Sequence, residues 1–271
     1  MRNIGIIGGT GIYDSGKILG LKEKLIYTPY GKVKLNLGSI AGNRVAFMNR
    51  HGIDHGTPPH KVNYKANIFA LKLVGCEEIF ATTAVGSLNP NMKPGEFVVC
   101  SNIIDFTQNR DNTFFDGMLR GVAHVDFTYP YCETCRQRAI RNLEKLGLPF
   151  HREGVYVCTE GPRFETAAEV KLFASWGGDV VGMTNMPESV LAREAEMCYT
   201  TVSIVTNMGA GISPKPLSHK EVVAAMVDSV NNMNRLISCY IADNDPIEEQ
   251  CHCRNCMAEF GGFKMKLDQE E

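Results

Sequence analysis

Short runs of apolar, often β-branched residues alternate with longer amphipathic runs from residue 4 to about residue 242. The short runs predict strands, and the longer ones, whose apolar positions recur every three or four residues, predict helices. Strands and helices in alternation are typical of an α/β domain. We therefore expect an α/β domain built round a mostly buried central sheet.

The predicted elements cover most of the chain. The expected strands are Ile4–Ile7, Lys24–Tyr27, Val33–Ile40, Arg44–Met48, Glu78–Thr83, Glu96–Ile104, Gly154–Cys158, Asp179–Gly182 and Thr200–Thr206. The expected helices are Lys61–Val74, Cys132–Leu146, Thr166–Trp176, Pro187–Met197 and Ser218–Ile241. Ser218 and Glu221 have the spacing of a capping box at the start of the last helix. Residues 243–271 are polar and lose this periodicity, so we divide the chain into a domain, 1–242, and a C-terminal tail, 243–271.

Composition excludes several classes of protein. A chain of 271 residues with 44% hydrophobic content can bury a large core, so disorder is not its main state. A net charge of −2 gives no electrostatic excess for binding nucleic acid or a membrane surface. No apolar run approaches the roughly 20 residues of a membrane span, and no secretory signal begins the chain. We expect a cytoplasmic protein.

A glycine-rich turn follows the first predicted strand. Gly8, Gly9 and Gly11 allow backbone N–H groups to approach an anion, and Thr10 adds a hydroxyl. The turn resembles the dinucleotide-binding pattern G-x-G-x-x-G, but Asp14 occupies the place of the third glycine. A phosphate-binding turn and a plain tight turn both remain open for this segment alone.

Cationic and hydroxyl side chains follow other predicted strands. Arg50 and His51 come after Arg44–Met48, and a guanidinium suits phosphate, although an exposed Arg-His pair is also common without function. Thr83 and Thr184 stand at two further strand ends. No acidic metal-binding set accompanies these donors, which favours a free phosphate ion over a magnesium nucleotide.

The order of these motifs resembles one known family. The motifs on which the resemblance rests are GIIGGTGIYD at 5–14, TPYG at Thr28–Gly31, NRHG at Asn49–Gly52, PPHKVNYKANI at Pro58–Ile68, TAVGS at Thr83–Ser87, EGPRFET at Glu160–Thr166 and GMTNMPE at Gly182–Glu188. From Ile4 to Ile241 the chain is similar to the trimeric purine nucleoside phosphorylases, in the branch of the methylthioadenosine and methylthioinosine phosphorylases. This resemblance implies a single α/β domain with a mixed, partly barrelled central sheet flanked by helices.

The resemblance implies phosphorolysis, in which inorganic phosphate attacks C1′ of a purine ribonucleoside and releases the base. It assigns phosphate binding to Thr10, Arg50, His51, Thr83, the backbone of Ala84, and Thr184, and it packs Met183 on the ribose. Phosphate is then a co-substrate, and we expect neither a metal nor an organic cofactor in this site. The task of the site is positional and electrostatic.

The identity of the purine depends on two positions. Adenosine-type relatives resemble T-D-x-D after the strand Thr200–Thr206, whereas this chain has Thr206, Asn207, Met208 and Gly209. An asparagine amide can donate its N–H to N7 or to O6 of a 6-oxopurine. Glu165 resembles the glutamate that accepts a hydrogen bond from the N1–H of such a base. On adenine, that carboxylate would face a lone pair. We expect Asn207 and Glu165 to act in catalysis on inosine and guanosine, with methylthioinosine or methylthioadenosine as the alternative.

Two histidines extend the expected substrate site. His219 resembles a residue that contacts the ribose 5′-hydroxyl in 6-oxopurine enzymes, although a histidine at an exposed helix start is also common. His124 resembles a residue that the family lends to the neighbouring subunit. We therefore expect a homotrimer, or a homohexamer made of two trimers, that binds a purine nucleoside and phosphate.

Cys251, Cys253 and Cys256 form a tight cluster in the tail. They resemble a soft-metal ligand set, but one CxCxxC motif needs a further ligand, such as His252 or a thiol of Cys132-x-x-Cys135. The tail also resembles the Cys-x-Cys ends of heat-stable archaeal methylthioadenosine phosphorylases, which are linked to disulfides. Structural disulfides, which the resemblance favours, adventitious metal and inert thiols remain open, and none of these cysteines is expected to be catalytic.

Two functions outside this family compete with phosphorolysis. A nicotinamide-dependent oxidoreductase would use the GGTG turn, but the glycine spacing fails and the acid that binds the ribose is missing. A non-catalytic ligand-binding or redox-sensing protein would use the cysteine cluster instead. Phosphate-dependent release of hypoxanthine from inosine distinguishes the three functions.

Overall fold

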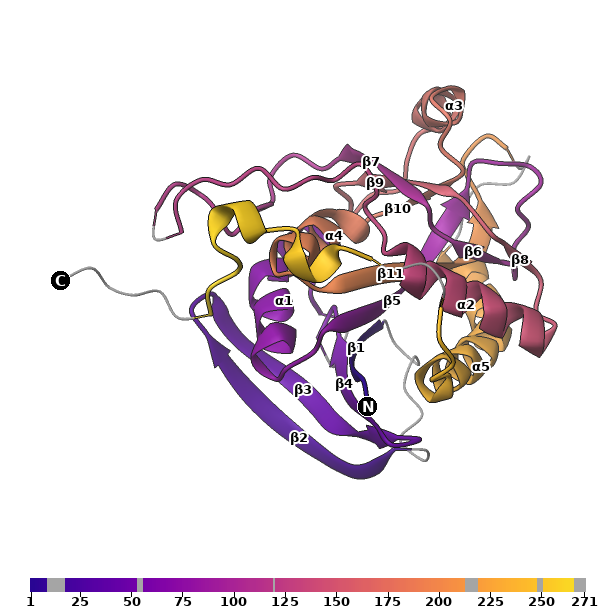
Figure 1. Cartoon of the computed structure of the whole chain (residues 1–271). Coiled ribbons are helices and arrows are strands. Elements are labelled where there is room, and N and C mark those ends of the chain that lie inside the picture. The colour runs from indigo at the N-terminus through magenta and orange to yellow at the C-terminus, as the bar shows by residue number, and fades with distance from the viewer. Residues whose placement is uncertain (9–17, 53–55, 119, 213–218, 248–250, 266–271) are drawn as a thin grey trace.

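The computed structural model describes residues 1–8, 18–52, 56–118, 120–212, 219–247 and 251–265, with only the backbone described for 219–228 (Figure 1). Its strands are β1 (Asn3–Gly8), β2 (Leu19–Thr28), β3 (Gly31–Ile40), β4 (Asn43–Asn49), β5 (Glu78–Ser87), β6 (Phe97–Val99), β7 (Asn102–Phe106), β8 (Phe150–His151), β9 (Val155–Thr159), β10 (Val180–Gly182) and β11 (Cys198–Met208). Its helices are α1 (Tyr64–Leu73), α2 (Glu133–Leu146), α3 (Ala167–Ser175), α4 (Asn185–Glu194) and α5 (His219–Ala242). Short 3₁₀ turns lie at Pro59–Lys61, Cys253–Asn255 and Ala258–Phe260.

The strands form one mixed sheet that branches at β5. The main path runs β2-β3-β4-β1-β5-β10-β9-β7, and β11, β6 and β8 extend from the other edge of β5. β5 pairs in parallel with β1 through its first residues and antiparallel with β10 through its last, while β11 runs parallel to it along its length. The carboxyl ends of β1, β4, β5 and β11 therefore meet at one edge of the sheet.

Alternation along β1 explains why helices cover both faces of the sheet. Ile4 and Ile6 are fully buried in a cluster with side chains of α2 and α5, whereas Ile7 is buried in another cluster with α1 and α4. A parallel strand buried on both faces needs this nearly continuous apolar sequence. The expected mixed sheet flanked by helices is confirmed.

One predicted strand is split in two. We expected a single strand over Glu96–Ile104, but β6 pairs with β11 and β7 pairs with β9. The change of partner occurs between adjacent residues, because Cys100 N–H donates to Thr201 and Ser101 N–H donates to Gly154. Both halves have the same β-branched composition, so the sequence pattern carries no signal of the switch.

The described part of the tail packs against the domain. In Figure 1 the yellow C-terminal segment lies beside α1 and α4. Met257 is fully buried, and Phe263 contacts the rings of Phe69 and Phe114 at centroid distances of 6.0 and 5.1 Å. Glu196 accepts backbone hydrogen bonds from both Met257 and Phe263. This part of the tail is therefore held in place by a hydrophobic core and by backbone contacts.

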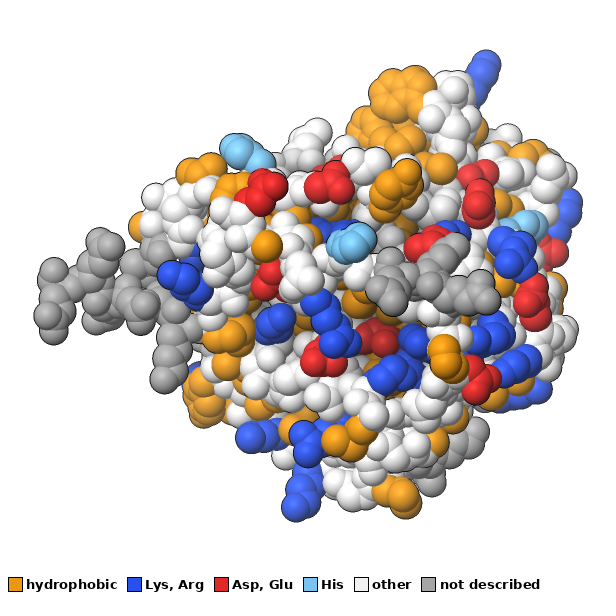
Figure 2. All heavy atoms as spheres, viewed as in Figure 1, with side chains coloured by type: hydrophobic (Ala, Val, Ile, Leu, Met, Phe, Trp, Pro, Cys, Tyr) orange, Lys and Arg blue, Asp and Glu red, His pale blue; other side chains and the backbone are white. Residues whose placement is uncertain are grey.

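The surface in Figure 2 mixes positive and negative side chains, and hydrophobic side chains gather over α3. Among the latter, Leu172 and Trp176 are 42% and 54% exposed. None of the helices in the described ranges combines the length and apolar character that crossing a bilayer requires.

Candidate active site

Arg50 lies directly after β4, at the sheet edge where the parallel strands end. Its backbone N–H donates to Gly8 at the end of β1, and its guanidinium turns inward. Nε and Nη2 donate to the two oxygens of Glu188 on α4 at 2.6 and 2.8 Å, and Nη1 donates to the Thr82 carbonyl at 2.9 Å. Three of the five N–H groups of the guanidinium are thus taken by described residues.

The Arg50–Glu188 pair is buried, with both side chains at most 2% exposed. Burial alone would lower the pKa of Arg50, but the Glu188 carboxylate outweighs it and holds that pKa above the ordinary value. Tyr199 supports the carboxylate by donating its hydroxyl at 2.8 Å. Burial and the nearby Glu188 charge raise the pKa of Tyr199, which keeps its hydroxyl protonated as a donor. Arg50 is therefore a fixed positive charge.

Thr83 and Ala84 lie on β5 beside β11, in register with Ser203 and Ile204. The hydroxyls of Thr83 and Ser203 hydrogen-bond at 2.7 Å, and Thr83 is buried. Ala84 is exposed at the same edge. This part of β5 adjoins β10, because Val181 pairs with Gly86 and the strands run in opposite directions. The chain after β10 therefore leads towards Thr83 and Ala84.

Met183 and Thr184 follow β10 and are placed by close backbone packing. A Cβ on Gly182 would lie 2.1 Å from the Tyr156 hydroxyl, so only glycine fits there. Thr184 is buried, and its backbone N–H donates to the same hydroxyl. Gly161 has φ +67°, and a Cβ on it would lie 2.6 Å from the Met183 sulfur. The EGP segment thus holds Met183 through a direct contact that needs a glycine.

Asn207 lies at the end of β11, where the register with β5 shifts after Val205. Its amide oxygen accepts from the Thr206 hydroxyl at 2.8 Å and its amide nitrogen donates to Met208 at 3.0 Å. A Cβ on Gly86 would lie 3.1 Å from this nitrogen. The bulge therefore lays the amide against the backbone of β5.

Glu165 lies just before α3, and one of its oxygens accepts the Thr159 hydroxyl at 2.7 Å. The loop after β11 packs against the start of the same helix, since a Cβ on Gly209 would meet Val170 at 3.1 Å and one on Gly211 would meet Ala167 at 2.7 Å. The structure thereby brings the segment of Glu165 and the loop of Asn207, Met208 and Gly209 together.

The remaining candidates are Thr10 and the histidines, which either lie outside the described residues or make few contacts with the other candidates. Thr10 and the His219 side chain lie outside the described residues. His51 follows Arg50, and its Nδ1 is 2.9 Å from the Thr57 carbonyl; because a carbonyl only accepts, Nδ1 carries a proton. His124 is exposed, and within the described residues no hydrogen bond or ion pair joins it to the other candidates.

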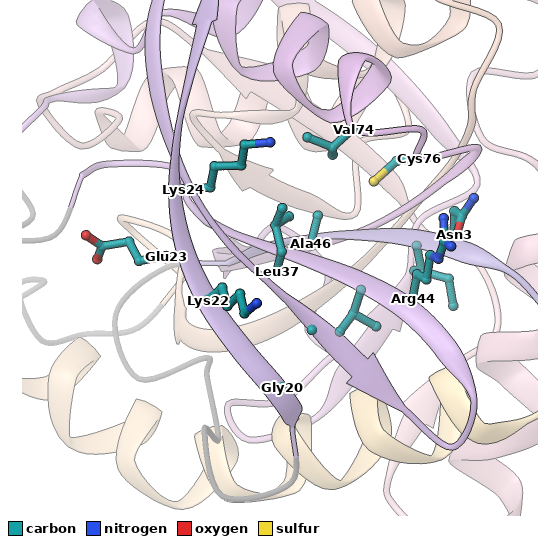
Figure 3. Close-up of a pocket in the computed structure, with 13 residues that line it drawn as sticks. Asn3, Gly20, Lys22, Glu23, Lys24, Leu37, Arg44, Ala46, Val74 and Cys76 are labelled. Carbon is teal, nitrogen blue, oxygen red and sulfur yellow. The ribbon is translucent and has the colours of Figure 1, made fainter.

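Two cavities adjoin the candidate residues, one at Arg50 and one at Glu165. One of about 400 Å³ includes Arg50, Asn49 and Thr57 in its lining. Another of about 220 Å³ is lined by Thr159, Glu165 and aromatic side chains of β7 and α3. A third, of about 550 Å³, lies on β1 to β4 and contains none of the predicted site residues. In Figure 3 its charged side chains point in different directions, Glu23 away from Lys24, so no group of polar atoms converges there.

Comparison with known families gives the same assignment as the motifs. The family model described as "Phosphorylase superfamily" matches residues 3–242. The chain belongs to this superfamily. The match ends where α5 ends, at Ala242, so the phosphorylase fold comprises the whole sheet and its five helices within the described residues.

Individual relatives cover nearly the whole phosphorylase chain. A protein named 6-oxopurine nucleoside phosphorylase from Pyrococcus furiosus is 51% identical, with 95% of this chain and 98% of that protein covered. A protein named S-methyl-5′-thioadenosine phosphorylase from Thermofilum pendens is 44% identical, with 94% and 97% covered. The crystal structure of a methylthioadenosine phosphorylase from an antarctic soil metagenomic library has a TM-score of 0.89 at 33% identity, with 95% and 91% covered.

Two buried side chains of the candidate site are not predicted by the sequence. Glu188 stands in the GMTNMPE motif, but its pairing with Arg50 spans 138 positions, and nothing in the sequence indicates it. Arg110, only 2% exposed, donates to the carbonyls of Met183 at 2.8 Å, of Glu160 at 2.7 Å and of Thr159 at 3.2 Å. It ties the ends of β9 and β10 together, but its polar sequence surroundings give no signal of this role.

Proposed function

We propose that the protein is a 6-oxopurine nucleoside phosphorylase, a pentosyltransferase that acts on inosine and guanosine. One observation carries the choice of substrate: the segment of Glu165 packs against the loop of Asn207, through Ala167 and Gly211. Glu165 and Asn207, carried by these two packed segments, supply the acceptor and donor that the N1–H, O6 and N7 edge requires. The name of the Pyrococcus furiosus relative supports the same substrate class.

Phosphate binding is assigned to the sheet edge beside the buried ion pair. Arg50, oriented by Glu188, supplies the cation, and we assign the other donors to Thr10, His51, Thr83, Thr184 and the backbone N–H of Ala84. Donors held rigidly at the ends of different strands fix the anion below C1′ at little entropic cost. Each such donor to developing charge contributes about 3 kcal/mol.

The proposed reaction forms one bond and breaks one. A phosphate oxygen bonds to C1′ while the C1′–N9 bond breaks and leaves its electron pair on the purine. Asn207 donates to N7 or O6, which stabilises the negative charge that develops on the leaving purine, and Glu165 accepts from N1–H, which fixes the orientation of the base. The proton given up by hydrogen phosphate ends on the released purine. The products are the free base and ribose 1-phosphate, and the reaction needs no metal or organic cofactor.

The sugar and the assembly complete the proposal. Met183 packs on the ribose, Met208 and Gly209 line the site, and His219 contacts the 5′-hydroxyl. We assign His124 to the site of a neighbouring copy in a homotrimer or a dimer of trimers, since its exposed position leaves it available. The exposed Leu172 on α3 and Trp176 directly after it, close in sequence to Glu165, support burial against a second copy. The proposed location is the cytoplasm.

The direct test is phosphate-dependent release of hypoxanthine from inosine. Full-length protein is incubated with inosine in phosphate and, as the matched control, in sulfate at the same ionic strength. The proposal predicts hypoxanthine and ribose 1-phosphate in equal amounts in phosphate and neither in sulfate. Release in both buffers would indicate hydrolysis, and release in neither would exclude the proposed activity.

A second candidate is phosphorolysis of a methylthio-nucleoside. The Thermofilum pendens relative, named as a methylthioadenosine enzyme, favours it. The two candidates differ at the 6-position and the 5′-substituent. Methylthioinosine in the same assay separates these effects, because it shares its base with inosine and its sugar with methylthioadenosine.

A further inference from the structure

Four cysteine sulfurs meet at a place remote in sequence from the phosphate motifs. Cys132, Cys198, Cys251 and Cys253 offer ligand atoms that all lie within 4.8 Å of one another, and the Cys198 and Cys251 sulfurs are 3.4 Å apart. Three of these residues are buried and Cys251 is half-buried. They come from the N-cap of α2, the first residue of β11 and the tail. The fold therefore assembles the cluster from three separate segments.

The spacing fits a cation at the centre of the cluster. Zinc bound to four thiolates has Zn–S distances of about 2.3 Å in a tetrahedron, which sets neighbouring sulfurs about 3.8 Å apart. The structure contains no disulfide, and all ten cysteines are free. The disulfides favoured by the tail's resemblance are thus not seen. Four thiols gathered within 4.8 Å of one another, rather than two bonded pairs, suit a tetrathiolate ligand set.

Two of the ligands are fixed by the sheet. The backbone N–H of Cys132 donates to Tyr199 at 2.8 Å, and that of Cys198 donates to Glu77 at 3.0 Å. The N-terminus of α2 favours a thiolate on Cys132. The Arg193 guanidinium lies 3.6 Å from the Cys253 sulfur and offsets part of the negative charge of four thiolates. The surroundings thus supply both rigidity and positive potential.

The contacts and exposure of the neighbouring residues distinguish the four clustered cysteines from the other candidate ligands. The Cys256 sulfur donates to the Arg193 carbonyl at 3.0 Å and is not a member of the cluster. His252, considered above as a fourth ligand, is exposed. Cys135 is buried beside the cluster, but the fourth member is Cys198. Cys198 has no partner nearby in sequence, so only the fold reveals it.

We propose that Cys132, Cys198, Cys251 and Cys253 form a structural zinc site. Four protein ligands leave no open position, so the ion is structural rather than catalytic. It joins the tail to α2 and β11 and thereby holds Met257 and Phe263 in their contacts. The Phe263 ring lies under the Arg120 guanidinium at 4.4 Å, so the zinc also secures the loop between β7 and α2.

The test is the metal content of full-length protein purified with a reductant and without a chelator. We expect one zinc ion per chain by elemental analysis. Replacing the zinc with Co²⁺ in the wild-type protein should give the visible and thiolate charge-transfer bands of a tetrahedral tetrathiolate. The spectrum needs no variant, so it remains decisive if a substituted chain fails to fold.

Variants then identify the ligands. Cys198→Ser and Cys253→Ser should reduce the zinc content to background, whereas Cys256→Ser and Cys239→Ser, which lie outside the cluster, should retain it. Folding is monitored by circular dichroism. Disulfide bonds among the four cysteines in unreduced protein, free thiols without metal, or zinc that persists in both ligand variants would each overturn the proposal.

Discussion

Glu188 receives Arg50 through two parallel hydrogen bonds, at 2.6 and 2.8 Å, in a setting where both side chains are almost completely buried. The pair joins the end of β4 to α4, and the Tyr199 hydroxyl adds a third hydrogen bond to the carboxylate. A doubly bonded guanidinium cannot rotate freely, so the carboxylate sets the direction of the remaining N–H groups. Glu188 is therefore a positioning residue for the proposed phosphate site.

Glu188→Gln should destabilise the fold and weaken phosphate binding together. Loss of one partner leaves the Arg50 charge buried without compensation, which costs about 3–5 kcal/mol. We expect this loss in urea unfolding, and a higher KM for phosphate than in the wild-type enzyme. The control is Glu144→Gln at the exposed Arg152–Glu144 pair, which should change neither quantity measurably. Equal effects of the two substitutions would contradict the positioning role.

Gly161→Ala should disturb the nucleoside site through Met183. The new Cβ would lie 2.6 Å from the Met183 sulfur, and the residue has φ +67°. Gly177→Ala is the matched control, because its φ is +86° and its Cβ would meet nothing within 4 Å. Both variants should lose about 1–2 kcal/mol of stability from backbone strain. Only Gly161→Ala should raise the KM for nucleoside, and an unchanged KM would show that Met183 does not contact the sugar.

Acid should weaken the contact that holds the end of α5. The Asp243 carboxylate accepts from Asn142 at 2.7 Å and from Arg141 at 2.8 and 2.9 Å. Burial opposes ionisation, but these donors outweigh it and hold the pKa of Asp243 below its ordinary value of 3.8. The resulting stabilisation is present above pH 3.8 and is lost as the pH falls through the folded-state pKa.

Urea unfolding of the wild-type protein and of Asp243→Asn from pH 6 to pH 3 tests this dependence. The wild-type protein should be the more stable at pH 6, and the difference should shrink towards pH 3. A difference that stays constant over this range would show that the Asp243 charge contributes nothing.

Hydrophobic periodicity predicted most of the fold because the local pattern and the burial agree. β1 and β11 are buried along nearly their whole length, as a parallel strand between helix layers requires, and their runs of apolar, β-branched and small residues match that burial. The predicted strand Glu96–Ile104 was wrong as a single element. Its division depends on which neighbours Cys100 and Ser101 bond, and those neighbours are distant in sequence.

The residues of the candidate site also fall into two groups, those that the sequence indicates and those that only the fold reveals. Arg50, Thr83, Glu165 and Asn207 are candidates from the sequence because they stand directly after strands or in a motif. Glu188, Arg110 and Cys198 were missed because each acts through partners that only the fold brings near. Glu188 stands in the GMTNMPE motif, but neither that motif nor the polar loop around Arg110 nor the strand of Cys198 shows which distant residue each contacts.

The ratio of kcat/KM for inosine to kcat/KM for adenosine, which differ only in the base, tests the central claim most directly when both are measured at saturating phosphate. Glu165 would face the N1–H of hypoxanthine as an acceptor but would oppose a lone pair of adenine, and a site that leaves such a group unpaired discriminates by about 10² or more. We predict a ratio of at least that size in the wild-type enzyme, and its collapse in Glu165→Gln. A kcat/KM for adenosine that equals or exceeds that for inosine would contradict the account.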